Sequence, residues 1–355
     1  MWKVQGDTAF LLSLKPRLEE EYARWEATHR LPSGLYWQEG VRDGMEESIS
    51  GGRKKQYARP TINSYMFGNA KALAWMNTLT DETDKARLYE QKADTLRKLI
   101  DTRLWNRDHQ FYETLRGDTL AQVREAIGYI PWYFNLPISD SLLSMASYRP
   151  DIEHDGAWLQ INDEQGFSAP YGLTTAERRH PQFRTHGIGT CEWDGAIWPF
   201  ATSQTLTALA NYLNDYPYPI IRDSVFFKQM QLYTESQHHR GRPYIGEYLD
   251  ETTGAWLMGD RERSRYYNHS TYNDLIITGI CGLRPQTDGS IVVNPLLPKD
   301  QWDYFCLDGI SYRGHTLTII WDRNGQRYHQ GCGLTLLVDG HAVANRNNLG
   351  KLTYP

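Results

Sequence analysis

The sequence predicts a mainly α-helical domain over residues 1–283, followed by a small antiparallel β module over residues 284–355. Apolar residues recur at helical spacing through most of the first part of the chain. After Gly282 the pattern changes to β-branched residues in partial alternation, as in residues 315–321. Helices followed by strands, without mixing, are typical of an α domain with an appended β domain.

The helices are predicted from apolar periodicity and from residues that begin helices. In the first helix Leu11, Leu14 and Leu18 recur on one face, and Asp7 can cap the N-terminus. The second helix begins at Pro60, because proline is favoured in the first helical turn. The predicted helices cover residues 8–28, 60 to 76, 81–104, 199–213, 222–236 and 269–281, with weaker patterns over 122–133 and 139–146.

Two long stretches of the helical part lack such periodicity. The first runs from the end of the first helix to Pro60, and the second covers residues 148–195, which are rich in Gly, Pro and His. Long irregular stretches in a compact domain are usually functional. In the β module, residues 322–325 and 338–341 carry turn signals that predict hairpins.

Composition excludes some classes of function and favours others. The 355-residue chain has a formal net charge of −5, which argues against a nucleic-acid-binding surface. No apolar run is long enough to cross a membrane. We expect no metal and no cofactor, because metal-ligand spacing and a glycine-rich phosphate loop are both absent. Aromatic residues make up 13% of the chain, which suits a carbohydrate-binding pocket; a large aromatic core is the alternative.

The N-terminal residues do not resemble a secretory signal peptide. We therefore expect a cytoplasmic protein if the sequence is complete. If the sequence is part of a longer precursor, we expect a periplasmic or secreted protein.

The first candidate site lies in the loop before Pro60, where Asp43 and Glu46 stand three residues apart and share a face of a helical turn. Tyr36, Trp37 and Met45 are expected to line a partly apolar pocket around them, which raises a carboxyl pKa and suits a general acid. Two alternatives remain open. The D-x-x-E spacing also resembles a capping box, and the segment could be a solvated acidic loop.

The second candidate site is the segment around Glu247, which follows a glycine and stands between apolar residues. A carboxylate in that setting is expected to be buried and polarised. The alternative is an ordinary turn carboxylate that pairs with Arg240 or Arg242. Asp250, three residues further on, precedes a plain turn and is interpreted as structural.

The third candidate site lies just before the helix that begins near Pro199. Trp193 and Trp198 flank Asp194 and Gly195, so the rings could stack on a sugar while the carboxylate binds its hydroxyl groups. The alternative is that Asp194 caps the helix and the tryptophans belong to the core. The full set of predicted substrate-binding residues is Tyr36, Trp37, Arg42, Trp193, Asp194, Gly195 and Trp198.

These three segments together resemble the six-hairpin (α/α)6 glycoside hydrolases, in the branch of family 63 and the mannosylglycerate-hydrolase-like domains. Residues 43–48 resemble the family's E-S-G-M-D-N-S motif, which places Glu46 at the general-acid position. The family has Asp there, and this departure leaves Asp43 as a rival. Residues 193–198 resemble its W-R-G-P-V-W sugar-subsite segment. Residues 247–254 resemble its E-Y-F-D-P-x-T-G segment, which bears the general base, here Glu247.

The resemblance implies an (α/α)6 toroid and an inverting, exo-acting glycoside hydrolase in which Glu46 protonates the leaving oxygen and Glu247 activates water. The family's N-terminal F-W-D motif is missing, and the predicted helices are too few for a complete ring. The resemblance therefore implies an incomplete toroid that self-associates or pairs with an N-terminal partner. The alternatives are a glycoside phosphorylase, a lyase acting through Tyr171 or His186, and a non-catalytic carbohydrate-binding or scaffold remnant.

Overall fold

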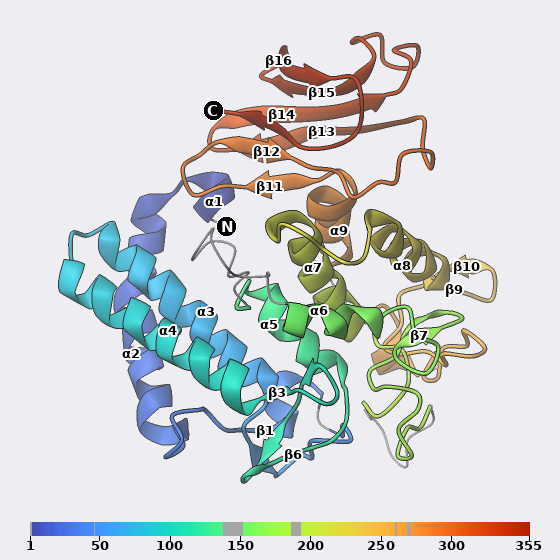
Figure 1. The fold of residues 1–355 in the computed structure, drawn as a ribbon. Coiled ribbons are helices and arrows are strands. Elements are labelled where there is room, and N and C mark those ends of the chain that lie inside the picture. Colours follow the sequence, from blue (N-terminus) through green and yellow to red (C-terminus); the bar gives the residue numbers. More distant parts are fainter. Residues whose placement is uncertain (1, 46, 138–151, 186–192, 260, 268–270) are drawn as a thin grey trace. The chain divides into compact units, whose positions relative to one another are not determined.

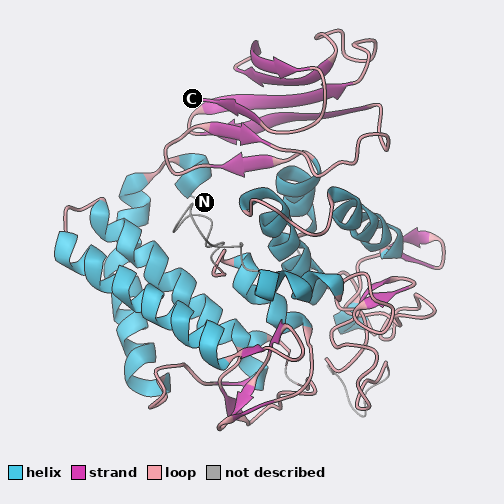
Figure 2. Ribbon diagram, viewed as in Figure 1, coloured by secondary structure: helices cyan, strands magenta, loops and turns pink. Residues whose placement is uncertain are grey.

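The computed structural model describes residues 2–45, 47–137, 152–185, 193–259, 261–267 and 271–355. They divide into two compact units. One unit contains residues 15–221 and 229–270 and is mainly helical; the other contains residues 1–14, 222–228 and 271–355 and holds the long strands (Figure 1). Figure 2 shows the same division by secondary structure. The predicted fold class, a mainly α chain with a C-terminal antiparallel module, is confirmed.

The long helices lie where periodicity predicts them, within a few residues at each end. They are α2 (Thr8–His29), α3 (Pro60–Thr78), α4 (Thr83–Arg103), α7 (Pro199–Asp215) and α8 (Asp223–Ser236). The weak pattern at 122–133 forms the 3-10 turn η2 (Ala126–Tyr129) and the short helix α5 (Ile130–Tyr133). The helix expected over 139–146 lies outside the described residues.

The stretch predicted to be mostly loop contains one helix that periodicity did not reveal, α6 (Ile152–Leu159). Its apolar pattern is only two turns long, which is too short to be recognised against the surrounding glycines and prolines. None of the helices in the described ranges is long and apolar enough to cross a membrane.

Helix α3 packs along α4, and α2 contacts α3 through Glu19, which accepts a hydrogen bond from Asn77 at 3.0 Å. Buried residues occur around most of α3, whereas α4 buries one stripe at intervals of three or four residues, from Ala86 to Ile100. Helices α2 and α4 also touch directly, because the rings of Tyr22 and Tyr89 meet edge to face at 5.6 Å. This arrangement leaves the N-terminus of α3 beside the loop that carries the first motif.

Short two-stranded ribbons shape the long connections between these helices. Each strand has only two residues, so these ribbons brace loops and do not form a sheet core. The antiparallel pairs are β1 (Gln38–Glu39) with β2 (Gln56–Tyr57), β3 (Trp105–Asn106) with β4 (Phe111–Tyr112), β5 (Leu115–Arg116) with β6 (Thr119–Leu120), β7 (Ser168–Ala169) with β8 (Gly172–Leu173), and β9 (His238–His239) with β10 (Arg242–Pro243).

The β module consists of two antiparallel sheets, as the strand pattern predicts. The first has the order β11 (Leu283–Pro285), β12 (Ile291–Val293) and β17 (Leu352–Tyr354). The second is a meander of β13 (Tyr304–Tyr312), β14 (His315–Asp322), β15 (Gly333–Val338) and β16 (His341–Arg346). The predicted turn at 338–341 is present, with Asp339 and Gly340 both at positive φ. The turn predicted at 322–325 opens a longer loop, because β15 begins only at Gly333.

The two ends of the predicted helical part, residues 1–14 and 271–283, belong to the same compact unit as this module. The short helix α1 (Trp2–Gln5) is held by Arg313, whose backbone N–H donates to the carbonyl of Val4 at 2.6 Å and whose guanidinium lies 4.5 Å over the Trp2 ring. The helix predicted at 269–281 appears as α9 (Tyr272–Leu275) continuing into a π-helical turn, Ile276–Ile280; residues 268–270 lie outside the described residues.

Candidate active site

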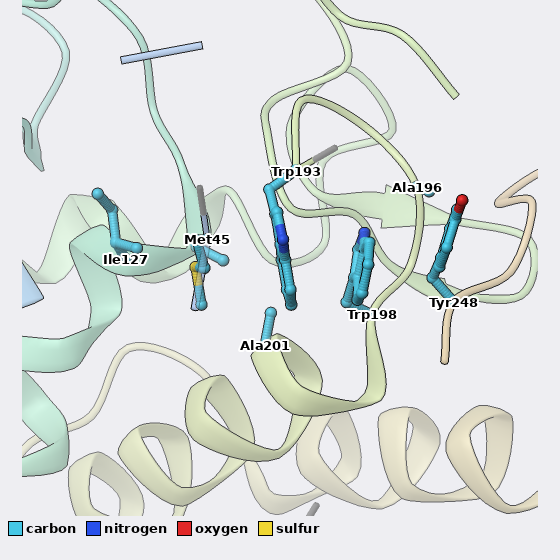
Figure 3. Packing of buried hydrophobic residues seen from close by; sticks show 8 residues of the cluster. Met45, Ile127, Trp193, Ala196, Trp198, Ala201 and Tyr248 are labelled. Carbon is cyan, nitrogen blue, oxygen red and sulfur yellow. The ribbon is translucent and has the colours of Figure 1, made fainter. Parts of the chain in front are cut away.

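The three motif segments meet in one buried cluster, although they lie far apart in the sequence. Met45 follows the 3-10 turn η1 (Gly40–Asp43), Trp193 and Trp198 precede α7, and Tyr248 follows Glu247. Figure 3 shows the three rings edge-on in a row, with Met45 between Ile127 and Trp193. The three segments that resemble the family's motifs are therefore packed together in the fold.

Backbone hydrogen bonds join the same segments. The N–H of Trp193 donates to the carbonyl of Glu47 at 3.4 Å, and Ile197 and Leu249 exchange two bonds of 3.0 Å. Gly195 permits a close chain approach, because a Cβ at that position would lie 2.0 Å from the carbonyl oxygen of Arg184. Gly195 is therefore required by backbone packing, whatever its role toward a sugar.

The loop that carries the first motif is held by Arg59, the residue that precedes α3. Its side chain is fully buried and its three nitrogens reach the loop on both sides of Glu46. Nε donates to Oδ2 of Asp43 at 2.7 Å, Nη2 to Oγ of Ser48 at 3.2 Å, and Nη1 to Oγ of Ser50 at 3.4 Å. A planar guanidinium with fixed donors orients all three partners at once.

Asp43, the rival candidate for the general acid, is an acceptor at both of its oxygens. Oδ2 accepts hydrogen bonds from Arg59 and from the hydroxyl of Thr61, the latter at 2.8 Å. Oδ1 accepts one from the backbone N–H of Met45 at 3.1 Å. A general acid must direct an oxygen at the leaving group, and both oxygens of Asp43 are already engaged by three protein donors. The geometry therefore favours a positioning role for Asp43. Glu46 lies outside the described residues, so its assignment as the acid stays a prediction.

Glu247, the predicted base, is buried with 3% of its surface exposed. Oε2 accepts a hydrogen bond from Ser264 at 2.5 Å, and Oε1 accepts one from Nη2 of Arg263 at 3.3 Å. Both donors come from the 3-10 turn η4 (Glu262–Ser264), which sequence patterns did not reveal. The neighbouring Asp250 accepts the backbone N–H groups of Thr252 and Thr253, which confirms its structural role in the turn.

Trp193 and Trp198 are buried in the cluster, as the alternative that assigns them to the core expects. Trp193 and Trp198 are 3% and 2% exposed and stack at 3.8 Å, and Trp198 stacks on Tyr248 at 4.2 Å. Burial of three large rings against each other provides more apolar contact than one exposed face would. The indole N–H of Trp193 has no hydrogen-bond partner in the part of the chain that the structure describes. A direct role in sugar binding stays a prediction.

Asp194 is 1% exposed and forms an ion pair with Arg184, with Nε and Nη2 at 2.6 and 2.5 Å from Oδ2. It does not cap α7, because the N-cap position belongs to Trp198 and has no side-chain cap; that alternative was wrong. The ion pair lies next to an isolated parallel β-bridge between Arg184 and Gly195.

Tyr36, Trp37 and Arg42 lie apart from the cluster, and the expected pocket of Tyr36, Trp37 and Met45 was wrong. The side-chain amide of Asn63 accepts a hydrogen bond from the N–H of Tyr36 and donates one to its C=O. These bonds direct this part of the loop toward α2. There the Trp37 ring lies 4.5 Å from that of His29. Arg42 is 71% exposed at its side chain and pairs only loosely with Glu39, at 3.7 Å. The lyase candidates are no better placed, since Tyr171 is 42% exposed and His186 lies outside the described residues.

Sequence reasoning missed a second buried carboxylate beside the loop, Glu125. It accepts the backbone N–H of Ser50 at 3.1 Å, and burial raises its pKa, although the charge of Arg59 and the bonds from Ser50 oppose the rise. No spacing marks Glu125 or Arg59 as partners of residues 43–50. The one usable signal is a charged residue directly before the proline that begins a helix, where a polar side chain often binds a neighbouring loop.

The structure shows a helical unit whose buried aromatic cluster joins two acidic loop segments, and comparison with known proteins identifies the family. Residues 1–270 match the model of the mannosylglycerate hydrolase MGH1-like glycoside hydrolase domain. The chain belongs to this glycoside hydrolase family. Residues 283–345 match the C-terminal domain of glycosyl hydrolase family 65.

Solved structures extend this comparison. A solved structure named "Sialidase" shares 61% sequence identity with this chain, at a TM-score of 0.94. The match covers 99% of this chain and 32% of the other chain, so the present chain spans about a third of that relative. Mannosylglycerate hydrolase of family 63 from Thermus thermophilus, in complex with Tris and D-glycerate, shares 15% identity at a TM-score of 0.44, over 62% of this chain and 45% of its own. We draw nothing from so distant a likeness.

We predict that Arg59→Met will destabilise the protein by about 3–5 kcal/mol, because it leaves the carboxylate of Asp43 buried without its partner. The double variant Arg59→Met/Asp43→Asn should recover part of this loss, since no uncompensated charge remains. Urea unfolding of both variants measures the difference. A single variant as stable as the wild type would show that the guanidinium does not hold the loop.

We predict that Trp198→Ala will lower the free energy of unfolding by about 3–5 kcal/mol, because it opens a cavity in the aromatic stack. Trp302→Ala is the matched control, since Trp302 is 39% exposed and its removal should cost less. Thermal unfolding and sugar binding are measured on both. Unchanged stability with weakened sugar binding would restore the subsite role.

Proposed function

We propose that this chain carries the acid and base of an inverting, exo-acting glycoside hydrolase, with Glu46 as general acid and Glu247 as general base. Inverting hydrolysis needs one carboxyl group to protonate the leaving oxygen and a second to activate water on the opposite face of the sugar. The observation that carries the proposal is the convergence of the two carboxylate-bearing segments on one cluster, through Met45 and Tyr248.

The surroundings of Glu247 suit a base. Ser264 and Arg263 donate to its two oxygens, so both oxygens act as hydrogen-bond acceptors, as the oxygens of a general base do. The hydrogen bond to Ser264 also fixes the direction of the carboxylate. These contacts support the role of base for Glu247 over that of acid.

The residues on either side of Glu46 both contact the aromatic cluster, Met45 by its side chain and Glu47 by its carbonyl oxygen. The segment that carries the proposed acid therefore lies beside the cluster that Tyr248 joins to the segment of Glu247, which supports the assignment. The unpartnered N–H of Trp193 is a donor that a substrate hydroxyl could satisfy, since buried polar groups rarely lack a partner.

We predict that Glu46→Gln will abolish hydrolysis of natural glycosides but spare aryl glycosides with very good leaving groups, because these need little protonation. Glu247→Gln should remove activity on every substrate, since no base then activates water. Initial rates on a series of aryl glycosides test both. If Asp43→Asn shows the leaving-group pattern and Glu46→Gln is near wild type, Asp43 is the acid and the assignment is wrong.

We propose, finally, that helix α2 binds a further helical segment. Phe10, Leu14 and Leu18 stand four residues apart and are 44%, 37% and 44% exposed, which forms an apolar stripe. Stripes of this kind are usually covered by a partner. The proposed occupant is a second copy of this chain or an N-terminal partner.

We predict that the wild-type chain self-associates as its concentration rises, and that Leu14→Glu/Leu18→Glu abolishes this by placing charges in the stripe. Leu159→Glu, at a leucine that is 54% exposed on α6, is the control and should leave association unchanged. Sedimentation at several concentrations measures it. A monomeric wild type with full hydrolytic activity would contradict the proposal.

A further inference from the structure

Glu125 is a buried carboxylate that the proposed acid and base leave without a role. Only 3% of its surface is exposed, and it belongs to the unit that carries the three motif segments. A carboxylate that is removed from water is costly unless neighbouring groups compensate for it. The groups around Glu125 therefore indicate what the fold uses it for.

The direct partner of Glu125 is Ser50, a fully buried residue in the loop of the predicted acid. Oε1 of Glu125 accepts the backbone N–H of Ser50 at 3.1 Å. The Ser50 hydroxyl shares a hydrogen bond of 2.7 Å with that of Thr114 and accepts one from Nη1 of Arg59 at 3.4 Å. The Ser50 carbonyl oxygen accepts one from Nε of Arg116 at 3.2 Å. Every polar group of Ser50 is thus bound by a residue outside the segment 43–50.

The backbone beside Glu125 is bound to the segment that carries the tryptophans. The N–H of Ala126 donates to the carbonyl of Thr175 at 2.8 Å, and the N–H of Thr175 donates to the carbonyl of Gly195 at 3.0 Å. Ile127, two residues after Glu125, packs in the same cluster as the tryptophans (Figure 3). Glu125 therefore connects the loop of the predicted acid to the tryptophan segment.

The charges of this network balance one another. Burial raises the pKa of Glu125, and the positive charges of Arg59 and Arg116 oppose that rise. Arg59 also forms the ion pair with Asp43, at 2.7 Å. Two carboxylates therefore compensate two guanidinium groups, and loss of Glu125 leaves the positive charges in excess.

We propose that Glu125 is a positioning residue for the general acid and acts through the backbone of Ser50. The inference rests on the proposed function, because it takes Glu46 as the acid. Ser50 stands four residues after Glu46 in the sequence, so the bond from Ser50 to Glu125 sets where the chain that carries the acid returns to the core. A general acid must lie within hydrogen-bond reach of the leaving oxygen, and a misplacement of about 1 Å can cost about 100-fold in rate.

The test is the dependence of hydrolysis on the leaving group, measured with a series of aryl glycosides on the whole chain. A misplaced acid slows substrates with poor leaving groups, which need protonation, and spares those with very good ones. We expect Glu125→Ala to lower kcat roughly tenfold more on poor leaving groups than on good ones, with KM little changed. Glu125→Gln keeps an acceptor for the N–H of Ser50 and should show a smaller difference.

Glu113→Gln is the matched control. Glu113 is 1% exposed, and burial raises its pKa as it does that of Glu125. Its partners are Asn106, His109 and the backbone N–H of Gln122, which all lie outside the loop of the predicted acid. Loss of this carboxylate should therefore change the rates on all leaving groups by the same factor.

Thr114→Val reaches Ser50 without a change of charge, because it removes only the hydroxyl that bonds the Ser50 hydroxyl. It should show the leaving-group pattern in weaker form, and it decides the matter if Glu125→Ala does not fold. The proposal is overturned if the Glu125 and Thr114 variants slow all substrates equally or not at all while Glu46→Gln shows the leaving-group pattern. If Glu46→Gln itself lacks that pattern, the proposed function fails and this inference fails with it.

Discussion

The guanidinium of Arg59 holds the loop on which the predicted acid stands, and its burial makes it a strict constraint. A charge that is fully removed from water must be compensated, and here Asp43, Ser48 and Ser50 supply the acceptors. Because these three residues lie before and after Glu46 in the sequence, the guanidinium joins the described parts of the loop on either side of it. The backbone of Arg59 begins α3, so the loop is fixed relative to the most buried helix of the unit.

The aromatic stack fixes the other half of the candidate site. Trp198 lies between Trp193 and Tyr248, which joins the segment before α7 to the segment that carries Glu247. Met45 extends the cluster to the loop that Arg59 holds. Packing of this density places main-chain atoms within narrow limits, and catalytic groups need such limits because small displacements cost large factors in rate.

Much of the fold could be predicted from the sequence because long helices leave a local pattern. The stripes of α2, α3, α4 and α7 repeat at helical spacing over three turns or more, whereas α6 and the two-residue ribbons are too short to leave a pattern. The resemblance assigned residues 43–48 and 247–254 to one acid–base pair, and both segments do contact one cluster. The structural role of Asp250 followed from turn chemistry alone.

The candidate site was less predictable, for physical reasons that differ by residue. A tryptophan in an acidic, glycine-containing segment suits a sugar face and a core equally well, and only the packing of Tyr248 on Trp198 decides between them. Tyr36 stands near Met45 in sequence, yet Asn63 directs it to α2. Arg59 and Glu125 act across long sequence separations, which no local spacing records.

The most direct test of this account is the distance between the carboxyl groups of Glu46 and Glu247 in a crystal structure of the complete active protein. An inverting pair needs space for one water between base and sugar, so we expect a separation of about 6.5–9.5 Å across one cleft. A separation of about 5–5.5 Å would indicate a retaining mechanism. Carboxyl groups on opposite faces of the helical unit would contradict the proposed catalytic pair altogether.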